Sequence, residues 1–143
     1  MTMKDVEKKI NQHKTFKDID VKDILEEGTG YAHEIVKDNR VVGKKSRNLK
    51  TAQLRKFFGA LKKMEHKDSW KDIESDFYLL KPRMAIAKGR GNIPGDFFDV
   101  IMAAMAKVDN IDDDDLKMEN FKLFIKFFEA IIAYHKYEYP KAA

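Results

Sequence analysis

The chain has 143 residues and a mass of 16.7 kDa, and 43% of its residues are apolar, which suits one domain with a packed core. It contains no cysteine, which excludes a disulfide scaffold, a thiolate zinc site and a cysteine nucleophile. No run of about 20 apolar residues is present, and the first residues lack the apolar segment of a signal peptide. We therefore expect a single domain over residues 1–143 that lies in the cytoplasm and does not contact a membrane.

The charges are unevenly distributed along the chain. The net charge is +4 and the isoelectric point is about 9.1. Residues 37–90 hold 16 Lys/Arg against 6 Asp/Glu, whereas the rest of the chain holds 12 against 18. Blocks of opposite sign predict one basic face or belt. A lysine-rich solvated surface is the simpler alternative.

The first predicted elements are a tail and a broken helix. Residues 1–17 are polar with few apolar anchors, which predicts a loose N-terminal tail. Residues 20–38 carry apolar side chains at helical spacing, interrupted by a Gly-Thr-Gly run at 28–30. Because glycine costs about 1 kcal/mol in a helix interior, we expect the helix to break there. Residues 39–50 are expected to form a loop with five basic residues and no acidic one.

Residues 51–66 form the clearest amphipathic helix, with Thr51 as the predicted N-cap. Its apolar side chains follow an i, i+3, i+4, i+7, i+10 pattern, which places them within a sector of about 120°. These residues are Leu54, Phe57, Phe58, Leu61 and Met64. The opposite face of this helix is almost wholly basic.

A helix over residues 69–89 follows, and Ser69 resembles the first residue of a capping box. Pro82 lies inside its apolar pattern. Because proline cannot donate to the carbonyl four residues earlier, we expect a kink near Leu79. The glycine-rich run 89–92 is predicted to end the helix, with glycine as a left-handed cap.

Two strongly apolar helices complete the pattern. Residues 96–108, with Asp96 as predicted N-cap, are apolar over most of the helix circumference, so this helix is either central or partly covered by another subunit. Residues 115–138 form the longest helix, and the acidic run 112–115 complements its dipole. Burial and contacts between copies are two explanations for the surplus of Phe and Met on both helices. The predicted fold is an all-α, compact bundle of about five helices.

Patterns of catalytic or metal-binding residues are lacking in the sequence. There is no Walker lysine loop, GxSxG elbow or HExxH, the four histidines lack metal-ligand spacing, and the acidic run 112–115 lacks the pattern of an EF-hand. We expect no enzymatic activity, no metal and no cofactor. The histidines are interpreted as ordinary surface or boundary residues, and the methionines as core fillers. Trp70 is expected to pack in the bundle, with stacking on a base as the alternative.

A basic belt is the feature that indicates a partner. Its members occupy the 39–50 loop and the two helices that follow. They are Lys44, Lys45, Arg47, Lys50, Arg55, Lys56, Lys62, Lys63, Lys81, Arg83, Lys88 and Arg90. Phosphate backbones bind such a surface through Coulomb attraction and counterion release, without base contacts. No recognition-helix pattern and no RNP aromatics are present, so binding independent of sequence is expected.

Two stretches in this order add a resemblance. They are TAQLRKFF at 51–58 and FYLLKPRMAIAKGR at 77–90. In a basic helical chain of this length they resemble the small subunit of type III-A CRISPR effector (Csm) complexes, mainly over residues 48–135. The residues that match in type and place are Arg55, Lys56, Lys81, Arg83 and Arg90. Lys44, Lys45 and Arg47 are candidates on charge alone.

The resemblance implies a function that composition does not. Members of this family are non-catalytic helical subunits of a prokaryotic ribonucleoprotein complex for antiviral defence. They stack in several copies along the inner filament, beside the backbone and large subunits. They line the channel where guide RNA and target RNA pair, and cleavage of the target belongs to the backbone subunits. The expected partners are therefore guide RNA, target RNA, neighbouring copies, and the backbone and large subunits.

Two other classes of function are weighed against this one. A helical protein–protein adaptor would use the basic surface to contact an acidic partner. A nuclease would need clustered carboxylates or histidines in a pocket, and the acids of this sequence are not arranged that way.

Overall fold

The computed structural model describes residues 1–42 and 49–141, and every element within them is helical. The elements are α1 (Met3–Asn11), η1 (Phe16–Asp18), α2 (Val21–Leu25), α3 (Tyr31–Val42), α4 (Thr51–Glu65), α5 (Trp70–Gly89), α6 (Gly95–Ala106) and α7 (Asp114–Glu138). The all-α class is confirmed. The predicted count of about five is too low, because the described residues form seven α-helices and one 3-10 turn. None of these helices is long and apolar enough to cross a membrane.

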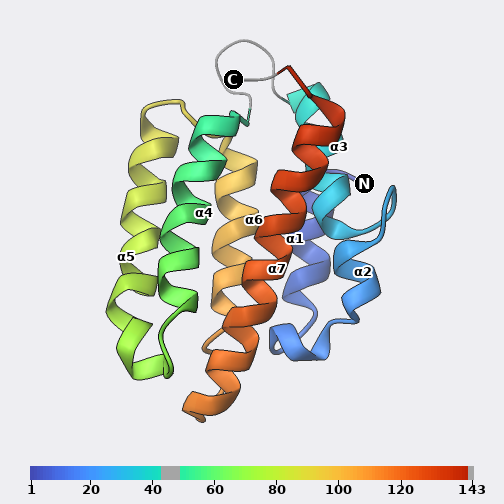
Figure 1. Ribbon diagram of the computed structural model, residues 1–143. Helices are drawn as coiled ribbons and strands as arrows, with labels where there is room; N and C mark the ends of the chain where they lie inside the picture. The colour runs from blue at the N-terminus through green and yellow to red at the C-terminus, as the bar shows by residue number, and fades with distance from the viewer. Residues whose placement is uncertain (43–48, 142–143) are drawn as a thin grey trace.

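The longest helix, α7, lies at the centre of the bundle. It packs against α2, α3, α4, α5 and η1, which explains why its sequence is apolar on nearly every side. Figure 1 shows α4 and α5 side by side at one edge, with α6 beside them and α1 to α3 at the other edge. Five large side chains of α7 are 0–1% exposed, namely Phe121, Phe124, Phe127, Phe128 and Ile131. For these side chains burial explains the surplus of aromatic residues.

The prediction of a loose N-terminal tail is wrong, because residues 3–11 form α1. The Thr2 hydroxyl accepts from the Asp5 N–H (3.1 Å), and the Asp5 carboxylate accepts from the Thr2 N–H (2.9 Å), which closes a capping box. Met3, Val6 and Ile10 lie on one face of the helix and are 0–1% exposed. These three anchors suffice because α6 and α3 bury them.

The predicted break within residues 20–38 is confirmed, since α2 ends at Leu25 and α3 begins at Tyr31. Gly28 has a φ of +83°, a conformation that favours glycine. Gly30 is required for space, because a Cβ there would lie 2.5 Å from the backbone nitrogen of Glu26. The two glycines therefore turn the chain tightly between α2 and α3.

The starts of α4 and α6 differ from prediction by one or two residues. Lys50 is the N-cap of α4, and Thr51 is its first, buried residue. Pro94 is the N-cap of α6, and Asp96 lies in the first turn instead. The negative charge of Asp96 still complements the helix dipole there.

Both ends of α5 lie where the sequence predicts them. Ser69 is the N-cap. Its hydroxyl donates to the Asp72 carboxylate (3.1 Å) and makes no capping hydrogen bond to the backbone of the first turn of α5, which lies within the described residues. Gly91, with a φ of +74°, ends the helix, and the Asn92 N–H donates to the carbonyl five residues earlier (2.8 Å) in a Schellman arrangement. Pro82 lies inside one continuous helix, and the kink remains a prediction.

The helices enclose one cluster of buried hydrophobic side chains. Trp70 is 1% exposed, and its ring lies edge-on to Phe77 with 5.4 Å between centroids, which confirms that it packs in the bundle. Met84, Met105 and Met118 are also buried, as predicted for core fillers. Because these side chains fix how each helix is rotated, they also decide which polar residues share an outer surface.

Candidate nucleic-acid interface

A basic groove of about 480 Å³ lies between α4 and α5. It is lined by Arg55, Lys56, Gly59, Ala60, Lys63, Met64, Lys67, Asp76 and Arg83. We call these nine residues the α4–α5 groove. Its lining holds five cationic side chains and one carboxylate.

The buried stripe of α4 positions the cations of the groove. Leu54, Leu61 and Met64 are at most 4% exposed, so the opposite side of the helix faces solvent. Arg55 and Lys63 lie on that exposed side, two helical turns apart. On α5, the buried stripe likewise leaves the exposed Arg83 at the groove.

Gly59 lies one turn from both Arg55 and Lys63 and leaves an open space between them. A Cβ at this position would meet nothing within 4 Å, so packing within the chain does not require glycine. In a helix interior glycine costs about 1 kcal/mol relative to alanine. The space left by Gly59 is of the kind that lets a ligand backbone approach a helix closely.

The cations of the groove are not neutralised by the protein. None of the five forms an ion pair with an acidic side chain in the part of the chain that the structure describes. Asp76 is the single carboxylate in the lining. Neighbouring like charges repel one another, and a bound polyanion would relieve this repulsion.

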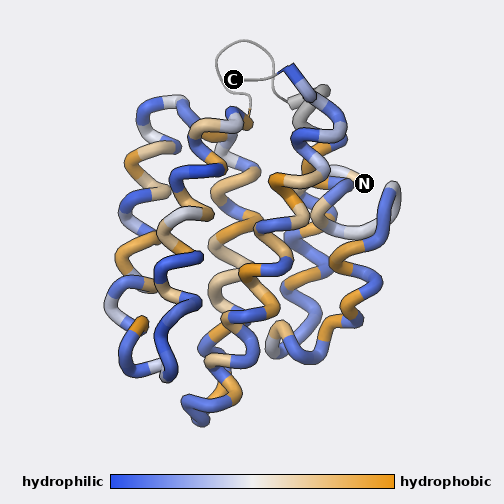
Figure 2. The backbone as a smooth tube through the Cα atoms, in the orientation of Figure 1, coloured by the Kyte–Doolittle hydropathy of each residue, from blue (hydrophilic) through white to orange (hydrophobic). Residues whose placement is uncertain are grey.

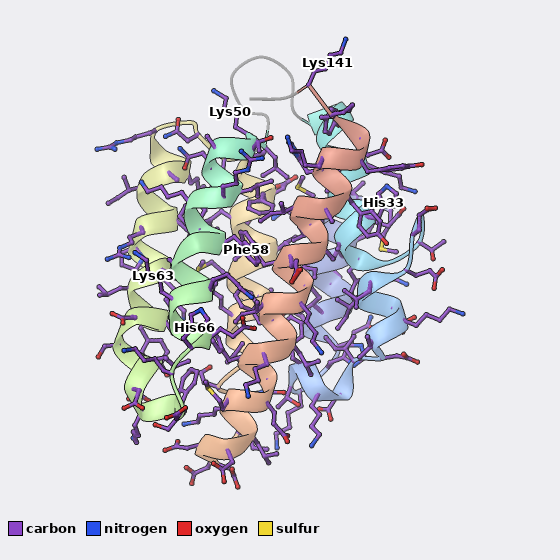
Figure 3. The ribbon with its side chains drawn as sticks, viewed as in Figure 1. His33, Lys50, Phe58, Lys63, His66 and Lys141 are labelled. Atoms are coloured by element: carbon purple, nitrogen blue, oxygen red, sulfur yellow. The ribbon has the colours of Figure 1, made fainter. Side chains whose placement is uncertain are left out.

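Lys62, although adjacent to Lys63 in sequence, faces α7 instead of the groove. Its Nζ lies 2.5 Å from Oε1 of Glu65 and 5.8 Å from the centre of the Phe58 ring. The hydrogen bond with Glu65 raises the pKa of Lys62, so its charge is retained and already paired. Figure 3 shows Phe58 between α4 and α7, where its ring stacks on Phe128.

Lys81 and Lys88 lie over aromatic rings. The Nζ of Lys81 is 5.4 Å from the ring centre of Tyr78, and that of Lys88 is 4.9 Å from the ring centre of Phe98 on α6. The Tyr78 hydroxyl donates to Asp109 (2.6 Å), and this bond raises the pKa of Tyr78 to about 12. The tyrosine therefore stays neutral at physiological pH.

Lys50 and Arg90 lie at one end of the bundle, at the start of α4 and the end of α5. Figure 3 shows Lys50 at this end, which also carries Lys141. The predicted residues Lys44, Lys45 and Arg47 lie outside the described residues. Of the twelve predicted residues, four lie together in the α4–α5 groove, namely Arg55, Lys56, Lys63 and Arg83. The other predicted residues that the structure describes lie on different surfaces. Lys67 also lines the groove and was not among the candidates, although it continues the spacing of Lys63.

The histidines differ from the sequence interpretation, because His33 and His135 are buried at 3% and 2% exposure. His33 Nδ1 accepts from the Gly28 N–H (2.8 Å), its Nε2 lies 3.0 Å from Glu138, and its ring stacks on Tyr134. These histidines connect elements inside the fold. Among residues 1–42 and 49–141, no group of three His, Cys, Asp or Glu side chains is placed to hold a metal ion.

Comparison with protein families supplies the assignment. The family model Csm2 Type III-A matches residues 30–141. The chain belongs to the Csm2 family. This confirms the resemblance to the small subunit of type III-A complexes, and the Csm2 family is a family of structural small subunits. The match contains both helices of the groove, whereas α1, η1 and α2 precede it.

No curated protein matches the chain. No solved structure matches it either.

Proposed function

We propose that this Csm2-family subunit holds the sugar–phosphate backbone of guide RNA and target RNA in the α4–α5 groove without reading their sequence. It does so as one of several copies stacked along the inner filament of a type III-A complex, beside the backbone and large subunits. It works in the prokaryotic cytoplasm as a single, non-catalytic domain.

The observation that carries the proposal is the set of five cations in the groove, none of which forms an ion pair within residues 1–42 and 49–141. Arg55 and Lys63 lie eight residues apart on α4, which corresponds to about 12 Å along the helix axis. One strand of a duplex advances ~3.4 Å per nucleotide along its axis, so this distance matches the backbone of about three to four nucleotides. Arg55 and Arg83 can each bond phosphate with two N–H groups.

The composition of the groove supports binding that ignores base identity. Its lining contains no aromatic side chain that would provide a stacking surface for bases. It also contains no histidine and a single carboxylate, Asp76. A general acid paired with a general base is therefore lacking among the residues that line it. These features favour a structural role over a nuclease.

The test is a fluorescence-anisotropy titration of the protein with random-sequence RNA at several salt concentrations. If five cations engage phosphates of a single strand, the slope of log K against log salt is about −3.5. Affinity should grow with RNA length up to the reach of the groove, and two unrelated sequences should bind equally. Failure to bind at low salt, or an affinity indifferent to RNA length, would instead favour an adaptor with an acidic protein partner.

A further inference from the structure

The outward face of α5 is uncharged and apolar along most of its length. Ser75, Leu79, Pro82 and Ile86 follow one another at intervals of three or four residues, and all four are exposed. Leu79 is 46% exposed and Ile86 is 54% exposed. We call these four residues the α5 strip. In a chain with 36% charged residues, a row of uncharged side chains along one exposed helix face is a candidate interaction surface.

The fold aims this strip away from the molecule. The opposite face of α5 is buried through six side chains, namely Trp70, Ile73, Phe77, Leu80, Met84 and Ala87. The neighbours that it packs against are α4, α6 and α7, and Figure 1 shows α5 at the edge of the bundle. Figure 2 shows hydrophobic positions recurring along the whole of α5. The helix is therefore apolar on two sides, and the described chain covers one of them.

The charges beside the strip are ordered along the helix. Asp72 and Asp76 lie in the N-terminal half of α5, Arg83 lies in its C-terminal half, and Arg90 is its C-cap. All four are exposed. At 3.6 residues per turn they fall within about 40° of one another, on the flank that faces α4. One flank of the strip is thus acidic in one half and basic in the other.

This arrangement is complementary to itself when two copies of α5 run antiparallel. A two-fold axis perpendicular to both helices places the same flank of each helix side by side and reverses its direction. The acidic half of one copy then faces the basic half of the other. A parallel pair would bring opposite flanks together and would leave this pattern without a counterpart. With the axis between residues 80 and 81, Leu79 of one copy meets Pro82 of the other, and Ser75 meets Ile86.

We propose that the α5 strip is a contact between two copies of this chain, packed antiparallel about a two-fold axis. The occupant is a second copy because the charges that border the strip match themselves in reverse order. This two-fold contact closes between two copies, so it differs from the head-to-tail stacking of the proposed function, and it requires no RNA. Asp76 and Arg83 also line the α4–α5 groove, so self-association and RNA binding should weaken one another.

Single cysteines test the geometry directly, because the chain has no cysteine of its own. Under mild oxidation, Leu79→Cys should form a disulfide-linked dimer. Ser75→Cys or Ile86→Cys alone should not, since each lies about 8 Å from the axis along the helix and therefore about 16 Å from its own copy. A mixture of these last two variants should cross-link to each other. Cross-linking of Ser75→Cys and Ile86→Cys each to itself would indicate a parallel pair and would overturn the proposal.

Sedimentation equilibrium without RNA provides the second measurement. The wild-type chain should show a concentration-dependent monomer–dimer equilibrium, and Leu79→Asp with Ile86→Asp should shift it to monomer while helical content is retained. Val21→Asp is the matched control, because Val21 is an equally exposed apolar residue (47%) on α2. A wild-type chain that stays monomeric, or a dimer that survives the double substitution, would overturn the proposal. The RNA affinity of the double variant is measured in a separate titration. That titration tests the proposed function, whereas sedimentation without RNA tests the contact between copies.

Discussion

The Nε2 of His135 donates a hydrogen bond to the carbonyl oxygen of Leu49, 2.8 Å away. This bond joins the last turns of α7 to the residue that precedes the N-cap of α4. Nδ1 of His135 is buried and has no hydrogen-bond partner among the described residues. Burial lowers the pKa of His135, because a charged ring would lie among apolar side chains with no acceptor for its second proton.

We predict that this histidine makes the protein less stable as the pH falls. Its pKa is below the ordinary 6.5 in the folded state, so the unfolded state binds more protons once the pH drops below about 6.5. The free energy of unfolding should therefore decrease from pH 7 toward pH 5. Urea unfolding should show that the difference in the free energy of unfolding between wild type and His135→Gln narrows as the pH falls. Parallel pH profiles would contradict the prediction, and the exposed His66→Gln is the control.

A double substitution in the groove should weaken RNA binding. Arg55→Gln with Lys63→Gln removes two phosphate contacts, so the log–log salt slope should become shallower by about 1.4. At about 1 kcal/mol for each contact, affinity should fall by more than tenfold. As the control, Lys122→Gln with Lys126→Gln removes the same charge from the exposed face of α7. If this control loses as much affinity, net charge and not the groove binds RNA.

Removal of the single acid in the groove should have the opposite effect. Asp76→Asn eliminates the repulsion between its carboxylate and a bound phosphate, so RNA affinity should rise several-fold at low salt. Asp112→Asn, an exposed acid in the segment before α7, changes the net charge equally and should have little effect. Anisotropy titrations of both variants in one buffer measure this. An unchanged affinity for Asp76→Asn would place the RNA away from this side of the groove.

Two substitutions at Gly59 should have different effects on the stability of the fold and on RNA binding. Gly59→Ala should raise the free energy of unfolding by about 1 kcal/mol, because alanine favours the helix and its Cβ meets no neighbour. Gly59→Glu, also a better helix former, should place a carboxylate between Arg55 and Lys63 and abolish RNA binding. Chemical unfolding and anisotropy measure the two effects. RNA binding that survives Gly59→Glu would exclude close contact of the phosphate backbone with this turn.

The N-terminal helix should be essential for stability. Ile10 is 1% exposed, and Ile10→Ala should lower the free energy of unfolding by about 2–5 kcal/mol because it leaves a cavity in the core. The exposed Lys9→Ala, one position earlier, should change it by less than about 0.5 kcal/mol. Thermal and urea unfolding distinguish the two. Equal stabilities would mean that α1 is dispensable for the bundle.

Local patterns predicted much of the fold. The helices over 51–66 and 115–138 were found within a residue or two, because a period of 3.6 is a local pattern and Pro140 follows the second helix closely. The end of α5 at Gly89, two residues before the left-handed Gly91, follows from the same kind of local constraint. The tail failed as a prediction because the anchors Met3, Val6 and Ile10 are too few to indicate a helix until α6 is seen to cover them.

By itself the sequence determined the all-α class, the approximate ranges of α4 to α7 and the excess of basic residues within 37–90, since all of these depend on local periodicity and composition. Only the tertiary structure decided which cations share a surface. Lys62 and Lys63 are adjacent in sequence, but a rotation of about 100° between neighbouring positions sends one to Glu65 beside α7 and the other into the groove with Arg83. That outcome depends on how buried side chains orient α4 against α5 and α7, and this packing is a property of the assembled core.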